Sequence, residues 1–306
     1  MSAPSSARAR QQSLRAHARN AAKKDPAYSA QERLRFFAFS RFLARVFADQ
    51  PDDWALKGAG ALLARIPVAR ASNDLDLVAR SSLDSVEDRL RHAAAVDLDD
   101  DFTFTIMSGS RPITGNNRGL RFTAEARIGP YRLAAFRVDV VVDWTNTQPP
   151  DTVPPTTPIP AAASSGPPWR VYPIADHLAD KVCATYQYAD PARSTRFHDL
   201  VDIALIACNL TVRAGDLVLA LETESRRRGI TLPPGYLPPD QAMWERGFTK
   251  LRRAVGPLGA RWPSYPEAVA IAQALLDPVL AGKRHEGMWD AAKRQWIDEN
   301  PRPGAR

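Results

Sequence analysis

Apolar positions in the first half of the chain follow two spacings, one typical of helices and one typical of strands. A helical stripe follows Ser29, a candidate N-cap with Glu32 three residues later. Beyond it, short apolar runs predict strands over residues 54–56, 68–79, 102–107, 120–128 and 131–144, and helices over residues 61–65 and 86–95. This succession predicts a small mixed β-sheet flanked by helices.

The second half has helical spacing almost throughout. Residues 145–168 precede it and are dominated by Pro, Thr, Ser and Ala, so we expect a linker or long surface loop there. Helices are predicted over residues 174–188, 197–209, 214–227, 240–255 and 266–280. The predicted fold class is therefore α+β, with an N-terminal sheet domain over residues 29–165 that ends in the Pro-rich loop, and a C-terminal helical domain over residues 166–306.

Residues 1–28 precede the first predicted helix and differ in composition from the rest. Residues 1–24 hold six Arg and Lys residues and no Asp or Glu, so we predict a basic flexible tail. An organellar presequence and an arm that follows nucleic-acid phosphates are alternatives. The whole chain carries a formal net charge of +7. This charge favours polyanionic partners such as nucleic acid, and it fits a plain solvated basic surface equally well.

The composition excludes several classes of protein. Hydrophobic residues make up 44% and charged residues 25%, which are globular proportions and not those of a disordered or fibrous chain. No apolar run reaches the roughly 20 residues that span a bilayer, so we expect a cytoplasmic protein with no membrane partner. Cys183 and Cys208 lie in apolar helical patterns, and we expect reduced core thiols.

Carboxylates are concentrated on two predicted strands. On the first, alternation would place four polar side chains on one face: Arg70, Ser72, Asp74 and Asp76. Adjacent carboxylates repel each other, so this row favours a bound cation, and oxygen ligands favour Mg²⁺ or Mn²⁺. Asp-x-Asp by itself also occurs in solvated turns. On the second strand Asp139 has β-branched neighbours and is our candidate third ligand and base, whereas Asp143 lies nearer the strand end and is expected to be solvated.

A glycine turn lies upstream of the acidic strand, between a predicted strand and a predicted helix. Gly58 and Gly60 would let backbone N–H groups approach a triphosphate closely at the start of that helix. Ordinary loop chemistry is the alternative explanation for two glycines in a turn. The acidic strand that follows favours the first explanation.

Taken together, these motifs resemble those of the AbiEii/AbiGii nucleotidyltransferase toxins, a family that includes the mycobacterial MenT toxins and belongs to the DNA polymerase β-like superfamily. The similar segments are residues 57–62 (a glycine turn), 70–76 (Arg-x-Ser-x-Asp-x-Asp), 137–140 (basic-apolar-Asp-apolar), 172–182 (a helix with a lysine) and 196–202 (Arg-x-x-Asp-x-x-Asp). They occur in order over roughly residues 54 to 208. Ala59 and Gly60 stand where the family has a small hydroxyl residue, which implies an altered nucleotide affinity.

The resemblance implies a role for each motif in metal-dependent nucleotidyl transfer. The implied metal ligands are Asp74, Asp76 and Asp139, and the implied catalytic set adds Lys181 and Asp199. The implied nucleotide-binding residues are Gly58, Ala59, Gly60, Arg70, Ser72 and Lys181, and supporting roles fall to Lys57, Arg196 and Asp202. Lys181 would hold the triphosphate, oriented by the acids of the second helical motif. A snorkelling surface lysine and a surface ion-pair ladder are the alternatives.

The resemblance also implies a biological role. It implies a toxin-like component of a toxin–antitoxin or phage-defence system that transfers nucleotides from a nucleoside triphosphate (NTP) to RNA, with the tRNA 3′ end as acceptor and a cognate antitoxin as partner. The expected RNA surface comprises Arg226, Arg227, Arg228, Lys250, Arg252, Arg253 and Arg261. One alternative is transfer to a small molecule or a protein hydroxyl, with an acidic pocket at Asp97 and Asp99 to Asp101. The other is a non-catalytic binding protein on the same fold.

Overall fold

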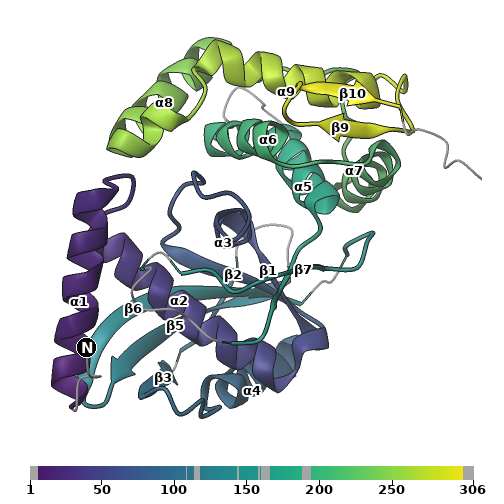
Figure 1. Cartoon of the computed structure of the whole chain (residues 1–306). Coiled ribbons are helices and arrows are strands. Elements are labelled where there is room, and N and C mark those ends of the chain that lie inside the picture. Colours follow the sequence, from purple (N-terminus) through teal and green to yellow (C-terminus); the bar gives the residue numbers. More distant parts are fainter. Residues whose placement is uncertain are drawn as a thin grey trace, which may run out of the picture. The chain divides into compact units, whose positions relative to one another are not determined.

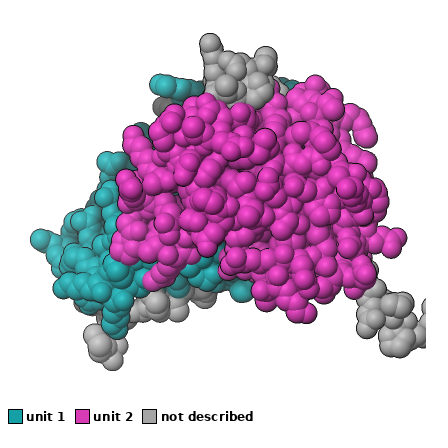
Figure 2. All heavy atoms as spheres, turned by 90° about the horizontal axis from the view of Figure 1, so that it is seen from above, with its two compact units in different colours: residues 1–144, 150–172 teal, residues 145–149, 173–306 magenta. Residues whose placement is uncertain are grey.

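A computed structural model (Figure 1) describes residues 6–107, 109–113, 118–142, 145–157, 159, 166–187 and 194–298. The chain divides into two compact units, coloured separately in Figure 2. The first contains residues 1–144 and 150–172, and the second contains residues 145–149 and 173–306. Apolar side chains are buried in both units. Asp143 lies outside the described residues.

The first unit contains an eight-stranded sheet in which seven strands follow the order β3-β5-β6-β2-β1-β8-β7, with β4 paired to β5. The strands are β1 Trp54–Lys57, β2 Asp74–Ala79, β3 Phe102–Ile106, β4 Arg111–Pro112, β5 Gly119–Ile128, β6 Tyr131–Val141, β7 Asp151–Val153 and β8 Trp169–Val171. Strand β2 runs parallel to β6 and antiparallel to β1. The predicted mixed sheet is therefore confirmed.

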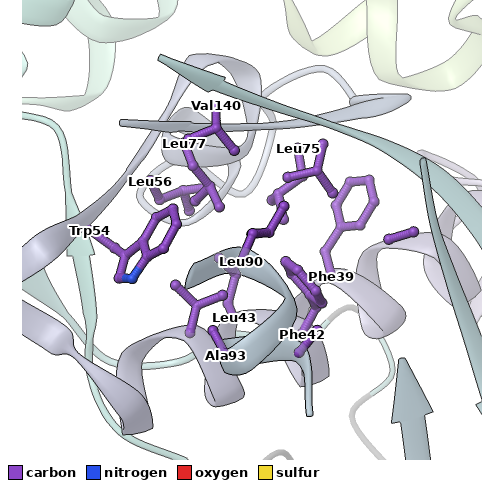
Figure 3. Packing of buried hydrophobic residues seen from close by; sticks show 14 of the residues in the cluster. Phe39, Phe42, Leu43, Trp54, Leu56, Leu75, Leu77, Leu90, Ala93 and Val140 are labelled. Carbon is purple, nitrogen blue, oxygen red and sulfur yellow. The ribbon is translucent and has the colours of Figure 1, made fainter. Parts of the chain in front are cut away.

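Four α-helices accompany this sheet in the described part of the first unit: α1 Ala7–Lys24, α2 Ala30–Asp49, α3 Gly58–Leu63 and α4 Leu83–Ala94. The predicted capping box at the start of α2 is present, because the Ser29 hydroxyl accepts from the backbone N–H of Glu32 and the Glu32 carboxylate accepts from that of Ser29. Figure 3 shows the core that α2 and α4 form with the sheet, including Phe39, Leu75 and Leu90.

The predicted flexible tail is wrong over residues 7–24, which form α1. The Ser6 hydroxyl caps this helix by accepting from the backbone N–H of Ala9. Leu14 and Ala18 lie one turn apart and are buried in a small cluster with Phe37. The sequence shows only a basic segment with few apolar residues. The helix is stabilised by packing against apolar residues from other parts of the chain.

The second unit is helical in its described residues, apart from a terminal hairpin. Its α-helices are α5 Ile174–Tyr186, α6 Phe197–Asn209, α7 Ala214–Arg228, α8 Gln241–Ala254 and α9 Tyr265–Leu280, and the hairpin strands are β9 Met288–Asp290 and β10 Gln295–Ile297. The helices agree closely with the predicted ones. No described helix combines the length and apolarity needed to cross a membrane.

Two short strands lie where the sequence predicted something else. β7 falls inside the predicted linker of residues 145–168, and it pairs with β8. β8 in turn pairs in parallel with β1, so it belongs to the first unit, although the predicted boundary assigned it to the helical domain. A strand of three residues is too short to show a clear alternation of polar and apolar side chains, so its sequence cannot be told from that of a loop.

Candidate active site

The three predicted metal ligands lie on neighbouring parallel strands. In the β2–β6 register, Asp74 is opposite Arg137 and Asp76 is opposite Asp139. Leu75 is buried in the core, and side-chain alternation along β2 therefore directs both acids of β2 to the other face of the sheet. The tertiary structure thus brings the Asp-x-Asp pair and the acid of β6 together, as the sequence motifs predicted.

The surroundings of Asp76 oppose ionisation of its carboxyl group. Burial, and then the charges of Asp139 and Asp74, raise the pKa of its carboxyl to about 7. The charges of Lys57 and Arg70 act in the opposite direction but do not cancel the shift. A carboxylate held in this way gains free energy from an added cation.

Arginine side chains hold the two outer carboxylates. Arg137 donates from Nε and Nη2 to the two oxygens of Asp74, at 2.6 and 2.7 Å. Arg121 makes the same bidentate contact with Asp139, at 2.8 and 2.6 Å. These contacts raise the pKa of both guanidinium groups. Each carboxylate is therefore held in a fixed orientation by its arginine.

Arg121 was missed by the sequence analysis, although the sequence holds a signal for it. β5 and β6 form a hairpin in which Ile128 pairs with Tyr131. Counting outward from that turn, with one irregularity in the register, places Arg121 directly opposite Asp139. The signal depends on a register that a bulge shifts by one residue, and so the sequence alone could not fix it.

The glycine turn packs directly against Asp76. Gly58 has φ +64°, and a Cβ added to it would lie 2.7 Å from Cγ of Asp76 and nearer still to Oδ2. A side chain at this position would therefore displace the central carboxylate. Ala59 and Gly60 follow in α3 and are buried. The approach of their backbone N–H groups to a triphosphate stays a prediction.

Arg70 and Ser72 lie before β2, not on it. The strand begins at Asp74, so the predicted strand face shared by all four polar residues is wrong. The Ser72 hydroxyl donates to the backbone oxygen of Asp74 at 2.6 Å and accepts from its N–H at 3.2 Å. This local turn competes with strand pairing, which explains the later start. The charge of Arg70 still lowers the pKa of Asp76.

The carboxylate row, formed by Asp74, Asp76 and Asp139, has the type of donor atom that divalent cations bind. Its donors are the hard oxygens that Mg²⁺ and Mn²⁺ prefer. Among the described residues, however, no group of three or more His, Cys, Asp or Glu side chains is already arranged to hold an ion. Arg137 and Arg121 engage both oxygens of each outer acid. Metal binding would require these arginines to give up part of those contacts.

Lys181 is the centre of a buried ionic cluster in the second unit. Its Nζ donates to Oδ1 of Asp199 at 3.1 Å and to Oδ2 of Asp202 at 2.5 Å. Arg196 Nε donates to the other oxygen of Asp199 at 2.5 Å. The Asp202 side chain is 0% exposed and that of Lys181 is 6% exposed. The snorkelling lysine and the surface ion-pair ladder are therefore wrong, and the contact of Lys181 with a triphosphate stays a prediction.

Two of the predicted RNA-binding arginines form ion pairs with acids of the second unit. Arg227 and Arg228 both donate to Glu224, and Arg228 also reaches Asp180 at 2.5 Å. The Arg228 side chain is only 6% exposed. Ion pairs within the unit therefore account for this part of the basic run.

Two acids of the cluster that could bind a cationic substrate, Asp100 and Asp101, already form ion pairs with arginines. Asp100 accepts from Arg41 and Arg45 in pairs as short as 2.5 Å, and both arginine side chains are buried. Asp101 binds Arg10 of α1 at 2.7 Å. Because both acids are already neutralised, they are poor anchors for a cationic substrate.

Comparison with known families agrees with this geometry. Residues 41–290 match the family described as nucleotidyl transferase AbiEii toxin, type IV TA system. The protein is a nucleotidyltransferase. It belongs to the AbiEii family of toxins of type IV toxin–antitoxin systems. No curated protein sequence matches the chain significantly.

One solved structure has a similar fold at low sequence identity. MenT4, a nucleotidyltransferase toxin from Mycobacterium tuberculosis H37Rv, has a TM-score of 0.51 and 16% identity, over 88% of this chain and 99% of MenT4. A candidate nucleotidyltransferase from H. pylori has a TM-score of 0.45 and 15% identity, over 82% of this chain and 95% of its own. The fold is therefore similar to that of MenT4, whereas the second likeness carries no weight.

Proposed function

We propose that this protein transfers nucleotides from an NTP to an RNA acceptor in a metal-dependent reaction, and that the acceptor is the 3′ end of tRNA. The observation that carries the proposal is the register of β2 and β6, which sets Asp76 beside Asp139 with Asp74 two residues away on the same strand. Three carboxylates on one sheet face, with a central member whose pKa is raised to about 7, favour a cation shared with a polyphosphate.

The proposed roles follow from in-line attack of an acceptor hydroxyl on the α-phosphorus, with pyrophosphate as leaving group. Asp74, Asp76 and Asp139 would hold Mg²⁺ or Mn²⁺, which supplies charge neutralisation and a lowered hydroxyl pKa when bound. Asp139 is the proposed acceptor of the hydroxyl proton. Arg121 would orient that carboxylate through one of its two present contacts, because the other oxygen of Asp139 is needed by the metal. Gly58 keeps the space beside Asp76 clear.

An RNA acceptor is supported by the charge of the chain and by one helical face. The formal net charge is +7. On α8, Trp244 and Phe248 are buried, while Arg246, Lys250 and Arg253 are exposed. The three cations follow a spacing of four and three residues, so they share one face of the helix and could neutralise successive phosphates. Membership of a type IV toxin–antitoxin family also implies a cognate antitoxin.

The test is transfer of label from each of the four α-labelled NTPs, with total tRNA, with a protein mixture or with no acceptor. We expect labelled tRNA in Mg²⁺ or Mn²⁺ and none with excess chelator. Asp74→Ala should abolish transfer, whereas Asp88→Ala, an exposed acid on α4, should leave it unchanged. Labelled protein in place of labelled tRNA would redirect the proposal to a different acceptor. No label in any arm would contradict it altogether.

A further inference from the structure

Helix α1 carries a row of exposed cations on one face. Its members recur at intervals of seven, four and four residues: Arg8, Arg15, Arg19 and Lys23. At 3.6 residues per turn, these intervals place all four side chains on the same face of the helix. With a rise of 1.5 Å per residue, this α1 basic row extends over about 22 Å.

The α1 basic row is not neutralised by any part of the chain that the structure describes. None of its four cations forms an ion pair with a described acid, whereas Arg10 on the same helix binds Asp101 at 2.7 Å. The helix itself contains no Asp or Glu. Like charges four residues apart, such as those of Arg15 and Arg19, destabilise a helix. An anion bound along the row would remove this cost.

The other side of α1 holds the helix in place on the first unit. Leu14 and Ala18 are buried in a cluster with Phe37. Gln11 Nε2 donates to the backbone oxygen of Arg132 in β6 at 2.8 Å. The helix packs beside α2 (Figure 1). The α1 basic row is therefore part of a packed surface, and a surface that is already ordered loses little conformational entropy when a partner binds.

The chemistry of the row favours nucleic acid among polyanions. The exposed residues of α1 include no aromatic or large apolar side chain, which the centre of a protein interface usually supplies. An anionic membrane is disfavoured because the apolar side of α1, with Leu14 and Ala18, is buried in the unit and cannot insert. A row of about 22 Å is also longer than a triphosphate group. A polynucleotide offers phosphates over such a length, since double-stranded DNA carries one charge per about 1.7 Å of its axis.

We propose that the α1 basic row binds the phosphate backbone of the acceptor RNA. The inference rests on the proposed function and deepens it, because it gives the unit that holds the carboxylates its own contact with the acceptor. Binding of this kind depends on phosphates and not on base sequence. The row therefore adds affinity for RNA, and the choice among RNA molecules falls to other contacts.

The test measures binding of fluorescently labelled tRNA to the full chain by anisotropy, over a range of salt concentrations, with Mg²⁺ and without NTP. A triple variant removes three adjacent charges of the row: Arg15→Gln, Arg19→Gln and Lys23→Gln. We expect it to raise the Kd for tRNA about tenfold at moderate ionic strength. The slope of log Kd against log salt concentration should fall by about 2 to 3, since three phosphate contacts are lost.

A matched control makes the same change of net charge at three exposed cations outside the first unit: Lys283→Gln, Lys293→Gln and Arg294→Gln. We expect this control to bind tRNA like the parent. The double variant Arg15→Lys with Arg19→Lys keeps the charges and should also bind like the parent. In urea unfolding, the triple variant of the row should be no less stable than the parent, because glutamine removes the repulsion between like charges.

The proposal is overturned if the triple variant of the row binds tRNA like the parent, or if the control loses as much affinity, which would be an effect of net charge alone. Vesicles containing phosphatidylserine and polyglutamate serve as membrane and protein probes, and tighter binding of either probe than of tRNA would also overturn it. If the parent transfers no label and only the triple variant loses tRNA binding, the row is supported and the proposed function alone fails. If the parent labels tRNA and the triple variant keeps its Kd and its KM for tRNA, the row is excluded and the proposed function stands.

Discussion

Replacing Gly58 with alanine tests whether the glycine turn protects the central carboxylate. The backbone at Gly58 has φ +64°, where an alanine costs about 1–2 kcal/mol. The new Cβ would also lie 2.7 Å from Cγ of Asp76, roughly 1 Å less than the ordinary carbon–carbon separation of about 3.5–4.0 Å. Asp76 must therefore move by about 1 Å. A displacement of that size in a reacting site can lower the rate about 100-fold.

Gly229 offers a matched control for the backbone effect. It also has φ +64°, at the end of α7, and a Cβ added there would meet no atom within 4 Å. We expect Gly229→Ala to lose about 1–2 kcal/mol in urea unfolding and to keep its kcat. Gly58→Ala should lose at least as much stability and, in the labelled-NTP assay, about 100-fold in kcat. Equal kcat values in the two variants would refute the reasoning.

Three further predictions concern buried charges and the metal. Asp100→Asn should cost about 3 kcal/mol at pH 7 by leaving Arg45 buried without its counter-charge, against about 0.5 kcal/mol for Asp101→Asn. Burial raises the pKa of Asp100, but its ion pairs with Arg45 and Arg41 together outweigh burial and lower that pKa in the folded protein. The difference in stability from the parent should therefore shrink as pH falls below about 4, and a constant difference would contradict the assignment. Asp202→Asn should destabilise the second unit by about 3 kcal/mol in urea unfolding, because Lys181 then loses the charge of a fully buried partner. An unchanged free energy of unfolding would show that the ionic cluster does not stabilise the unit. Finally, excess chelator should abolish nucleotidyl transfer reversibly, and activity that persists in chelator would show that the carboxylates work without a metal.

Local patterns were sufficient where a signal lies within a few residues. The capping box at Ser29 and Glu32 was predicted correctly, because both hydrogen bonds join residues three apart. The helices of the second unit were placed correctly for a similar reason, since their apolar stripes repeat over three or more turns. Asp74 and Asp76 were singled out because adjacent carboxylates favour a cation, and Asp139 because it lies among β-branched residues, where an unpaired charge is costly.

Predictions failed where a residue's environment is supplied by distant parts of the chain. Helix α1 forms because Leu14 packs near Phe37, which a basic segment does not reveal. β7 and β8 exist only through pairing with each other and with β1. Arg228 was predicted to belong to an RNA surface, but its guanidinium group binds Asp180, 48 residues away in sequence.

The sequence by itself determined which side chains could do chemistry: the acids of two strands, the glycine turn, and a lysine followed by an Arg-x-x-Asp-x-x-Asp helix. The tertiary structure decided how those groups are held. It paired Arg121 with Asp139, set Gly58 against Asp76 and buried Lys181 between two aspartates. The physical reason is the distance along the chain over which each interaction acts. Helical and strand periodicity express local geometry, whereas charge pairing and burial depend on strand register and packing between residues far apart in sequence.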